Sequence, residues 1–91
     1  MEMTKRQKIE CLEFCIEQLS NNHLYCGLCS LIREFYLSIL KGRETFSYYI
    51  FPEFQKHKPP ETGTSSYWWD INDKLSRIDY CKKLINILKE A

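Results

Sequence analysis

The sequence predicts an all-α fold, a compact bundle of three longer helices with an aromatic-rich irregular connector. Apolar residues recur at three- and four-residue steps in three separate segments, which is the spacing of one helix face. The chain has 91 residues, enough for one hydrophobic core but not for two. We therefore expect a single helical domain over residues 1–91, with helices at about 4–20, 24–41 and 71–90 and the connector at 43–70.

The first predicted helix begins near Thr4. Thr4 and Gln7 have the spacing of a capping box, in which each side chain accepts a hydrogen bond from the other residue's backbone N–H. Cys11 falls off the apolar stripe of this helix, and the Ser-Asn-Asn run at residues 20–22 ends it. The stripe is formed by Ile9, Leu12, Ile16 and Leu19, with Cys15 beside them.

The second predicted helix has an apolar stripe wider than a surface helix needs, which indicates the central helix of the bundle. Gly42 follows Lys41 and is expected to cap the helix, because glycine adopts the left-handed conformation without steric cost. The stripe is formed by Leu24, Leu28, Leu31, Ile32, Phe35, Tyr36, Ile39 and Leu40.

The connector begins with a segment that is dense in aromatic and β-branched residues, from position 43 to position 54. Thr45 or Ser47 is expected to cap a short helix, and Pro52 suits the first turn of another. A short strand over residues 48–51 is the alternative.

The last predicted helix follows a loop at residues 58–66, where consecutive prolines exclude a helix interior. It begins at Asp70 or Asn72, because Asp70 can cap it and Asp73 favours its positive end. Its apolar repeat consists of Leu75, Ile78, Cys81, Ile85 and Leu88.

The composition excludes several classes of partner and location. The 13 basic and 12 acidic side chains form no basic stripe, so we do not expect binding to duplex nucleic acid. No apolar run approaches the roughly 20 residues that cross a bilayer, so we expect no membrane contact. An odd number of cysteines and the lack of an export signal predict reduced thiols and a cytoplasmic protein.

The cysteines raise the question of a metal site. Two pairs, Cys11 with Cys15 and Cys26 with Cys29, could supply four thiolates to zinc, and His23 could add a further ligand. Structural zinc sites usually place one pair on a tight turn, and helices surround both pairs here. We therefore expect no metal and no cofactor, with buried apolar cysteines as the favoured interpretation.

No catalytic motif is present. The sequence lacks the nucleophile elbow of hydrolases, a glycine-rich phosphate loop, the setting of a thioredoxin-type cysteine pair and the paired motifs of zinc deaminases. The prediction is therefore that the protein is not an enzyme. An acid/base pair of Glu53 with His57 is the alternative that remains.

The aromatic content points to binding instead. Of 13 aromatic residues, eight lie between Phe46 and Trp69, more than so short a chain easily encloses. Plugging of the open end of the bundle by the tryptophans is the structural alternative, and a solvated loop is the alternative for His57. The expected partner- or ligand-binding residues are Tyr67, Trp68, Trp69, Arg77, Arg33, Arg43, Lys56 and His57.

Four stretches carry a resemblance: residues 26–32, residues 51–59, the triplet at 67–69 and the Arg-Ile pair at 77–78. Together they resemble a group of small uncharacterised bacteriophage proteins with a "GLC" helix and a "YWW" aromatic triplet. The resemblance implies a phage setting, and small phage accessory proteins often act by binding a host factor.

These observations lead to one functional expectation and one alternative. We expect a non-enzymatic phage-type binding protein that inhibits or sequesters a host defence component, in the host cytoplasm. Its partner would be a host protein or a nucleotide-like small molecule, and the surplus aromatic area favours a homo-oligomer. The alternative is a zinc-stabilised or oligomeric structural module.

Overall fold

The computed structural model of the protein describes residues 2–21, 28–57 and 74–90. Every regular element in these ranges is helical, so the predicted all-α fold is confirmed. No described helix has both the length and the apolar character needed to cross a membrane. The elements are α1 (Lys5–Ser20), α2 (Leu28–Glu34), the π-helical turn η1 (Phe35–Ile39), α3 (Ser47–Ile50), α4 (Pro52–Lys56) and α6 (Lys74–Glu90).

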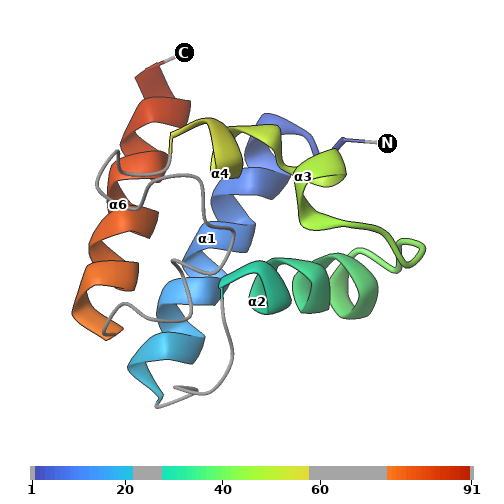
Figure 1. The fold of residues 1–91 in the computed structure, drawn as a ribbon, viewed down its shortest axis with the longest axis horizontal. Coiled ribbons are helices and arrows are strands. Elements are labelled where there is room, and N and C mark those ends of the chain that lie inside the picture. The colour runs from blue at the N-terminus through green and yellow to red at the C-terminus, as the bar shows by residue number, and fades with distance from the viewer. Residues whose placement is uncertain (1, 22–27, 58–73, 91) are drawn as a thin grey trace.

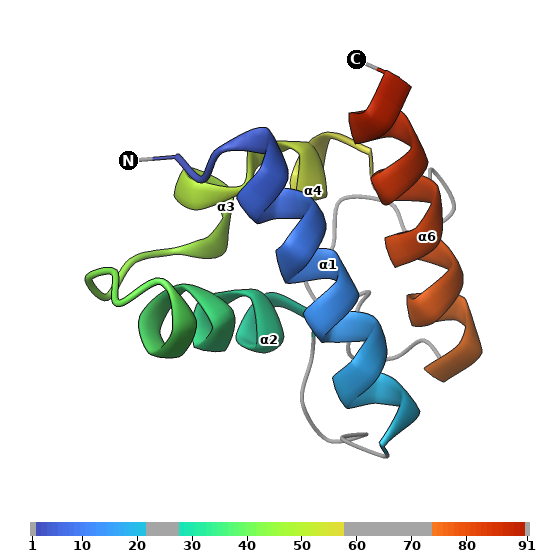
Figure 2. The same cartoon turned by 180° about the vertical axis from the view of Figure 1, so that it is seen from behind.

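Helix α1 lies at the centre of the described structure (Figure 1). It runs antiparallel to α6, and these two helices form the largest helix–helix contact. Helix α2 also packs on α1 and crosses it at a steep angle, as the reverse view in Figure 2 confirms. The short helices α3 and α4 lie at the end of the molecule where α1 begins and α6 finishes.

The start of α1 was predicted correctly. Thr4 and Gln7 form the capping box, with the Gln7 N–H donating to Thr4 Oγ1 at 3.2 Å and the Thr4 N–H donating to Gln7 Oε1 at 2.9 Å. The placement of Cys11 off the buried stripe was wrong, because Cys11 is fully buried. Because α1 contacts α6 as well as α2, its buried face is wider than one amphipathic stripe.

The core joins all the described elements. Tyr80 of α6 donates a hydrogen bond from its hydroxyl to the Phe54 carbonyl of α4 at 2.5 Å, and the two rings meet edge to face. The Met3 N–H donates to the Ile50 carbonyl at 3.0 Å, which ties the N-terminal segment to α3. The fully buried apolar side chains include Leu12, Leu19, Leu28, Leu31, Ile32, Phe51, Phe54 and Cys81.

The end of the second helix differs from the prediction. The helix changes from α to π over η1, and the left-handed residue is Lys41, with φ of 57°, rather than Gly42. Gly42 is needed for space instead, since a Cβ there would overlap the Tyr36 ring. Its N–H donates to the Tyr36 carbonyl at 2.9 Å, which holds the glycine against that ring.

The described beginning of the connector is helical. Helix α3 begins at Ser47 and α4 at Pro52, so the two short helices are confirmed and the alternative strand over residues 48–51 is wrong. Each is only about one turn, and proline suits a first turn because that N–H has no intrahelical partner. The predicted loop at 58–66 and the triplet at 67–69 lie outside the described residues, as do the beginnings of the second and last helices.

Candidate functional site

The predicted binding residues that the structure describes do not form one surface. Arg77 is buried in α6, with 4% of its surface exposed, so it does not offer an open cationic contact. Arg33 of α2 forms an ion pair with Glu44, whereas Arg43 lies exposed in the turn before α3. Lys56 and His57 are at the end of α4. Tyr67, Trp68 and Trp69 lie outside the described residues.

The aromatic residues of the connector divide into two classes. Phe51 and Phe54 are fully buried, with ring centroids 6.3 Å apart. Phe46 and Tyr49 are 62% and 57% exposed, and their rings contact one another with centroids 6.2 Å apart and planes inclined at 52°. We call Phe46 and Tyr49 the aromatic pair. Within the described residues, the expected surplus of aromatic surface is found here.

The aromatic pair lies at the start of α3, directly after a turn that protrudes from the molecule. The turn from η1 to α3 extends away from α1 and α6 in both views (Figures 1 and 2). Ile39, at the other end of that turn, is 52% exposed. Large apolar side chains that remain this exposed on a small domain mark interaction sites when they lie together.

A hollow with a volume of about 420 Å³ lies beside the same turn. We call it the Tyr36 hollow. Its charged residues are Lys41, Arg43 and Glu44, and Glu44 is already paired with Arg33. The hollow is lined by Tyr36, Lys41, Gly42, Arg43, Glu44, Thr45 and Ile50.

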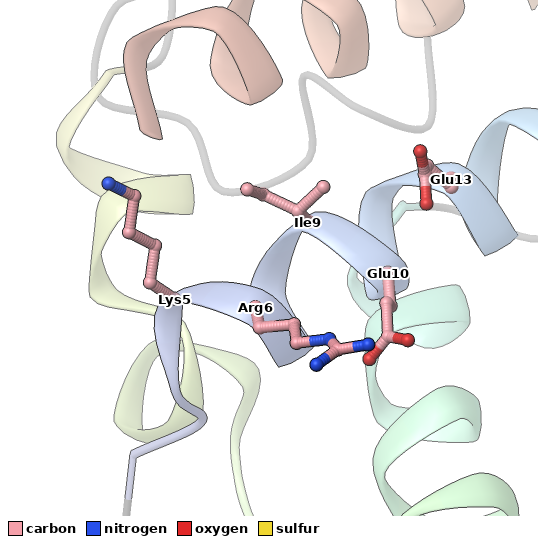
Figure 3. Close-up of a pocket in the computed structure, with 5 residues that line it drawn as sticks. All are labelled: Lys5, Arg6, Ile9, Glu10 and Glu13. Carbon is pink, nitrogen blue, oxygen red and sulfur yellow. The ribbon is translucent and has the colours of Figure 1, made fainter. Parts of the chain in front are cut away.

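A second hollow, of about 540 Å³, is lined by described residues of α1 alone (Figure 3). The Arg6 and Glu10 side chains extend to one side of the helix, and Ile9 and Glu13 extend to the other. The fifth lining residue is Lys5. Because two cations at one end of this face are balanced by two carboxylates at the other, it presents no net charge to a ligand.

Lys8 forms a buried ionic cluster that sequence reasoning missed. Its ammonium pairs with Glu2 and with Glu53, the latter at 2.8 Å, and lies 5.7 Å from the Phe51 ring centre. Burial by itself lowers the pKa of Lys8, but the two carboxylates outweigh it and the pKa is raised. No local signal marked Lys8, because its burial depends on Glu53 and Phe51, which lie far along the chain.

The Lys8 cluster also bears on the acid/base pair of Glu53 with His57. Burial raises the pKa of the Glu53 carboxyl, but the hydrogen bond from Lys8 outweighs it, and the pKa is lowered. Glu53 is therefore an engaged carboxylate at neutral pH and a poor proton donor. His57 is near enough to lower the Glu53 pKa further, and its backbone N–H donates to the Glu53 carbonyl at 3.1 Å.

Three of the cysteines lie in the core between α1 and α6. Cys11, Cys15 and Cys81 are free and fully buried. The hydrogen bond with Cys11 and then burial raise the pKa of Cys15, and burial raises the pKa of Cys81. Zinc requires thiolates, and a raised pKa disfavours the thiolate, so Cys15 and Cys81 behave as small apolar side chains.

The zinc alternative depends on cysteines that the structure does not place. Cys26 and the side chain of Cys29 lie outside the described part of the chain. Within the described part, no three histidine, cysteine or acidic side chains are grouped so that they could hold a metal ion. The favoured interpretation of buried apolar cysteines is supported at Cys15 and Cys81.

Comparison with protein-family models, with curated proteins and with solved structures finds no match to this chain. The function therefore has to be argued from the geometry. Two features of the described surface are candidates for binding: the exposed aromatic pair and the Tyr36 hollow.

Proposed function

We propose that this protein is a non-enzymatic binding protein that docks onto another protein through the aromatic pair. The observation that carries the proposal is the exposure of Phe46 and Tyr49, 62% and 57%, while their rings contact each other. The buried positions of Phe51 and Phe54 show that this segment has access to the core. Phe46 and Tyr49 nevertheless leave their rings at the surface.

Burial of these two rings in an interface would be a substantial source of affinity. Covering a large apolar side chain contributes roughly 1.5–3 kcal/mol, and aromatic residues are enriched among the few that dominate protein interfaces. Two rings that already contact each other also lose less rotamer freedom on binding than isolated exposed ones. Both rings are already exposed, Phe46 just before α3 and Tyr49 within it.

A protein fits this surface better than a small molecule does. A small ligand needs a concave site that buries most of its surface. Phe46 and Tyr49 line neither of the two hollows formed by described residues. An exposed aromatic pair instead suits a recess on a partner, in the manner of an interface anchor.

The resemblance to bacteriophage proteins supports a finer version of the proposal, in which the partner is a host defence factor. Expression in bacteria that carry a defence system tests this version, with phage plating as the measurement. Protection of the phage should be lost in the Phe46→Ser/Tyr49→Ser double variant. Equal plating with and without the protein, across the defence systems tried, would restrict the proposal to binding as such.

The binding proposal itself is tested by co-purification of the tagged protein from infected cells, followed by mass spectrometry of bound proteins. The Phe46→Ser/Tyr49→Ser variant should lose the partner, because serine removes both rings from the exposed surface. The matched control is Ile87→Ser on α6, which removes an apolar side chain that is 37% exposed. The control variant should retain the partner.

Two outcomes contradict the proposal. One is a partner that both variants retain equally, which would place the interface elsewhere. The other is a stable homodimer in sedimentation equilibrium that only the double variant dissociates, which would make a second copy of the chain the occupant. Thermal unfolding of each variant shows whether a lost partner reflects a lost fold.

A further inference from the structure

The Tyr36 hollow combines a concave shape with an excess of positive charge. Its two cations are Lys41 and Arg43, and neither takes part in the ion pairs found among described residues. Its carboxylate, Glu44, is paired with Arg33 on the neighbouring helix. The charge of Lys41 and Arg43 is therefore left for a ligand.

The hollow also offers neutral hydrogen-bond donors. Tyr36 is 92% buried, since only 8% of its surface is exposed, yet its ring lines the hollow. A Cβ at Gly42 would overlap the Cζ atom that bears the hydroxyl, so this end of the ring faces the glycine. No described residue forms a hydrogen bond with the hydroxyl. Thr45 brings a second hydroxyl to the lining.

The backbone that carries the cations is held in an uncommon conformation. The helix widens to a π turn at η1, and Lys41 then takes a φ of 57°, which lysine rarely adopts. The Leu40 N–H donates to the Phe35 carbonyl at 3.2 Å, and the Gly42 N–H donates to the Tyr36 carbonyl at 2.9 Å. These bonds fix the turn before any ligand arrives, which lowers the cost of binding.

The size and the apolar wall of the hollow restrict the ligand further. Its volume of about 420 Å³ exceeds what a bare inorganic ion fills and falls in the range of small-molecule sites. Besides the two cations, the lining includes apolar surface from Ile50 and the Tyr36 ring. The suited ligand has a compact anionic group attached to an apolar or aromatic body.

We propose that the Tyr36 hollow binds a small phosphorylated molecule. Arg43 and Lys41 hold the phosphoryl oxygens, since guanidinium and ammonium groups form charge-assisted hydrogen bonds with phosphate. The Tyr36 and Thr45 hydroxyls donate to the same group, and Ile50 contacts the body of the ligand. This binding uses other side chains than the aromatic pair and goes beyond the protein docking proposed above.

The test is an amide NMR titration of the full chain with phenyl phosphate, at constant ionic strength. Inorganic phosphate, phenylacetate and phenol are titrated in parallel. Phenyl phosphate should give saturable shifts centred on the amides of residues 41–45, with inorganic phosphate several-fold weaker because it lacks the apolar body. Phenol, which lacks the anion, should give none.

Three variants test whether phenyl phosphate binds in the Tyr36 hollow or at any exposed basic side chain. Arg43→Gln should weaken phenyl phosphate binding about tenfold, the size expected for one lost charge-assisted hydrogen bond. Lys41→Asn should weaken it by a similar factor while keeping the turn, because asparagine tolerates the left-handed conformation. The matched control is Lys83→Gln, an exposed charge on α6 that should leave binding unchanged.

Several results would overturn the proposal. They are shifts that do not saturate, equal weakening by Lys83→Gln, or phenylacetate binding as tightly as phenyl phosphate, which would make the hollow a carboxylate site. The Phe46→Ser/Tyr49→Ser variant keeps the two proposals apart, because it should bind phenyl phosphate normally. If the wild-type protein binds its protein partner but not phenyl phosphate, the ligand proposal for the Tyr36 hollow is wrong. If it binds phenyl phosphate but no protein partner, the docking proposal for the aromatic pair is wrong.

Discussion

Two cationic regions of this small protein differ in burial and in ion pairing. Lys8 of α1 has 4% of its side chain exposed, and two carboxylates and an aromatic ring surround it. Lys41 and Arg43, in the turn after η1, are exposed and lie outside the ion pairs of the described residues. Both regions lie beside α3: Lys8 is close to Phe51, which directly follows this helix, and the Tyr36 hollow is lined by its Ile50. The difference between the two regions is therefore not explained by which helix they are near.

The difference shows how the surroundings of a charge assign its role. A buried ammonium must be paired, because leaving it alone in the core is costly, and its partners then tie separate segments together. Lys8 connects the N-terminal segment, α1 and α4 in this way. An exposed cation beside a hollow stabilises the fold little and is available for a ligand. We therefore assign Lys8 to the fold and Lys41 with Arg43 to binding.

The strongest test of this comparison removes the buried charge. Lys8→Met keeps most of the side-chain volume but leaves Glu53 and Glu2 without their cation. Both glutamate side chains are partly exposed, so the expected loss is about 2 kcal/mol, below the roughly 3–5 kcal/mol for a fully buried partner. Urea denaturation measures it.

The matched control for this test is Lys83→Met, which removes an exposed lysine of α6 and should change the free energy of unfolding by less than about 0.5 kcal/mol. Equal effects of the two substitutions would show that Lys8 is no more structural than a surface lysine. The distinction between the two cationic regions would then have no energetic basis.

The second test concerns what holds the exposed region in place. Gly42→Ala introduces a methyl group that overlaps the buried Tyr36 ring, so the free energy of unfolding should fall by about 1–3 kcal/mol. Phenyl phosphate binding should weaken as well, because the turn that carries Lys41 and Arg43 has to move. The control is Ser38→Ala, an exposed position in η1. A Gly42→Ala variant as stable as wild type would refute the close packing.

The third and smallest effect is a pH dependence of the buried cluster. Burial raises the pKa of the Glu53 carboxyl, but the hydrogen bond with Lys8 lowers it by more, so the pKa is lowered in the folded protein. Its stabilisation is therefore complete above the ordinary glutamate pKa of about 4.3 and is lost as pH falls through the lowered value. The stability gap between wild type and Glu53→Gln should narrow below about pH 4.

Thermal unfolding at a series of pH values measures that gap. Lys8 does not confuse the result, because its raised pKa keeps its contribution intact at all pH below the ordinary lysine value of about 10.4. A gap that stays constant down to pH 3 would show that the Glu53 carboxylate gains nothing from Lys8.

Local signals in the sequence predicted the elements that depend on neighbouring residues. The capping box at Thr4 and the proline at the first turn of α4 were correct, since both follow from backbone N–H groups that lack intrahelical partners. The burial of Cys11 and Lys8 was missed, because a single stripe was assumed for a helix that contacts two others. Periodicity reports one buried face and does not say how many helices cover it.

The sequence predicted that aromatic residues would be exposed, but not which ones. The count of aromatic residues predicted a surplus at the surface, and Phe46 and Tyr49 show it among the described residues. Which rings would remain outside could not be known, since Phe46 and Phe51 belong to the same aromatic-rich stretch and no local pattern separates them. Arg43 was named as a binding residue, whereas Lys41 and Tyr36 were not, because the hollow exists only once Gly42 packs on the Tyr36 ring.

By itself, the sequence determined the helical class, the ends set by capping residues and the excess of aromatic rings, because each follows from chemistry within a few residues. The tertiary structure alone decided that Lys8 is buried, that Lys41 takes the left-handed conformation and that Phe46 stays exposed. These outcomes depend on which helices meet and how closely. Such contacts join residues far apart in the chain, and no local pattern records them.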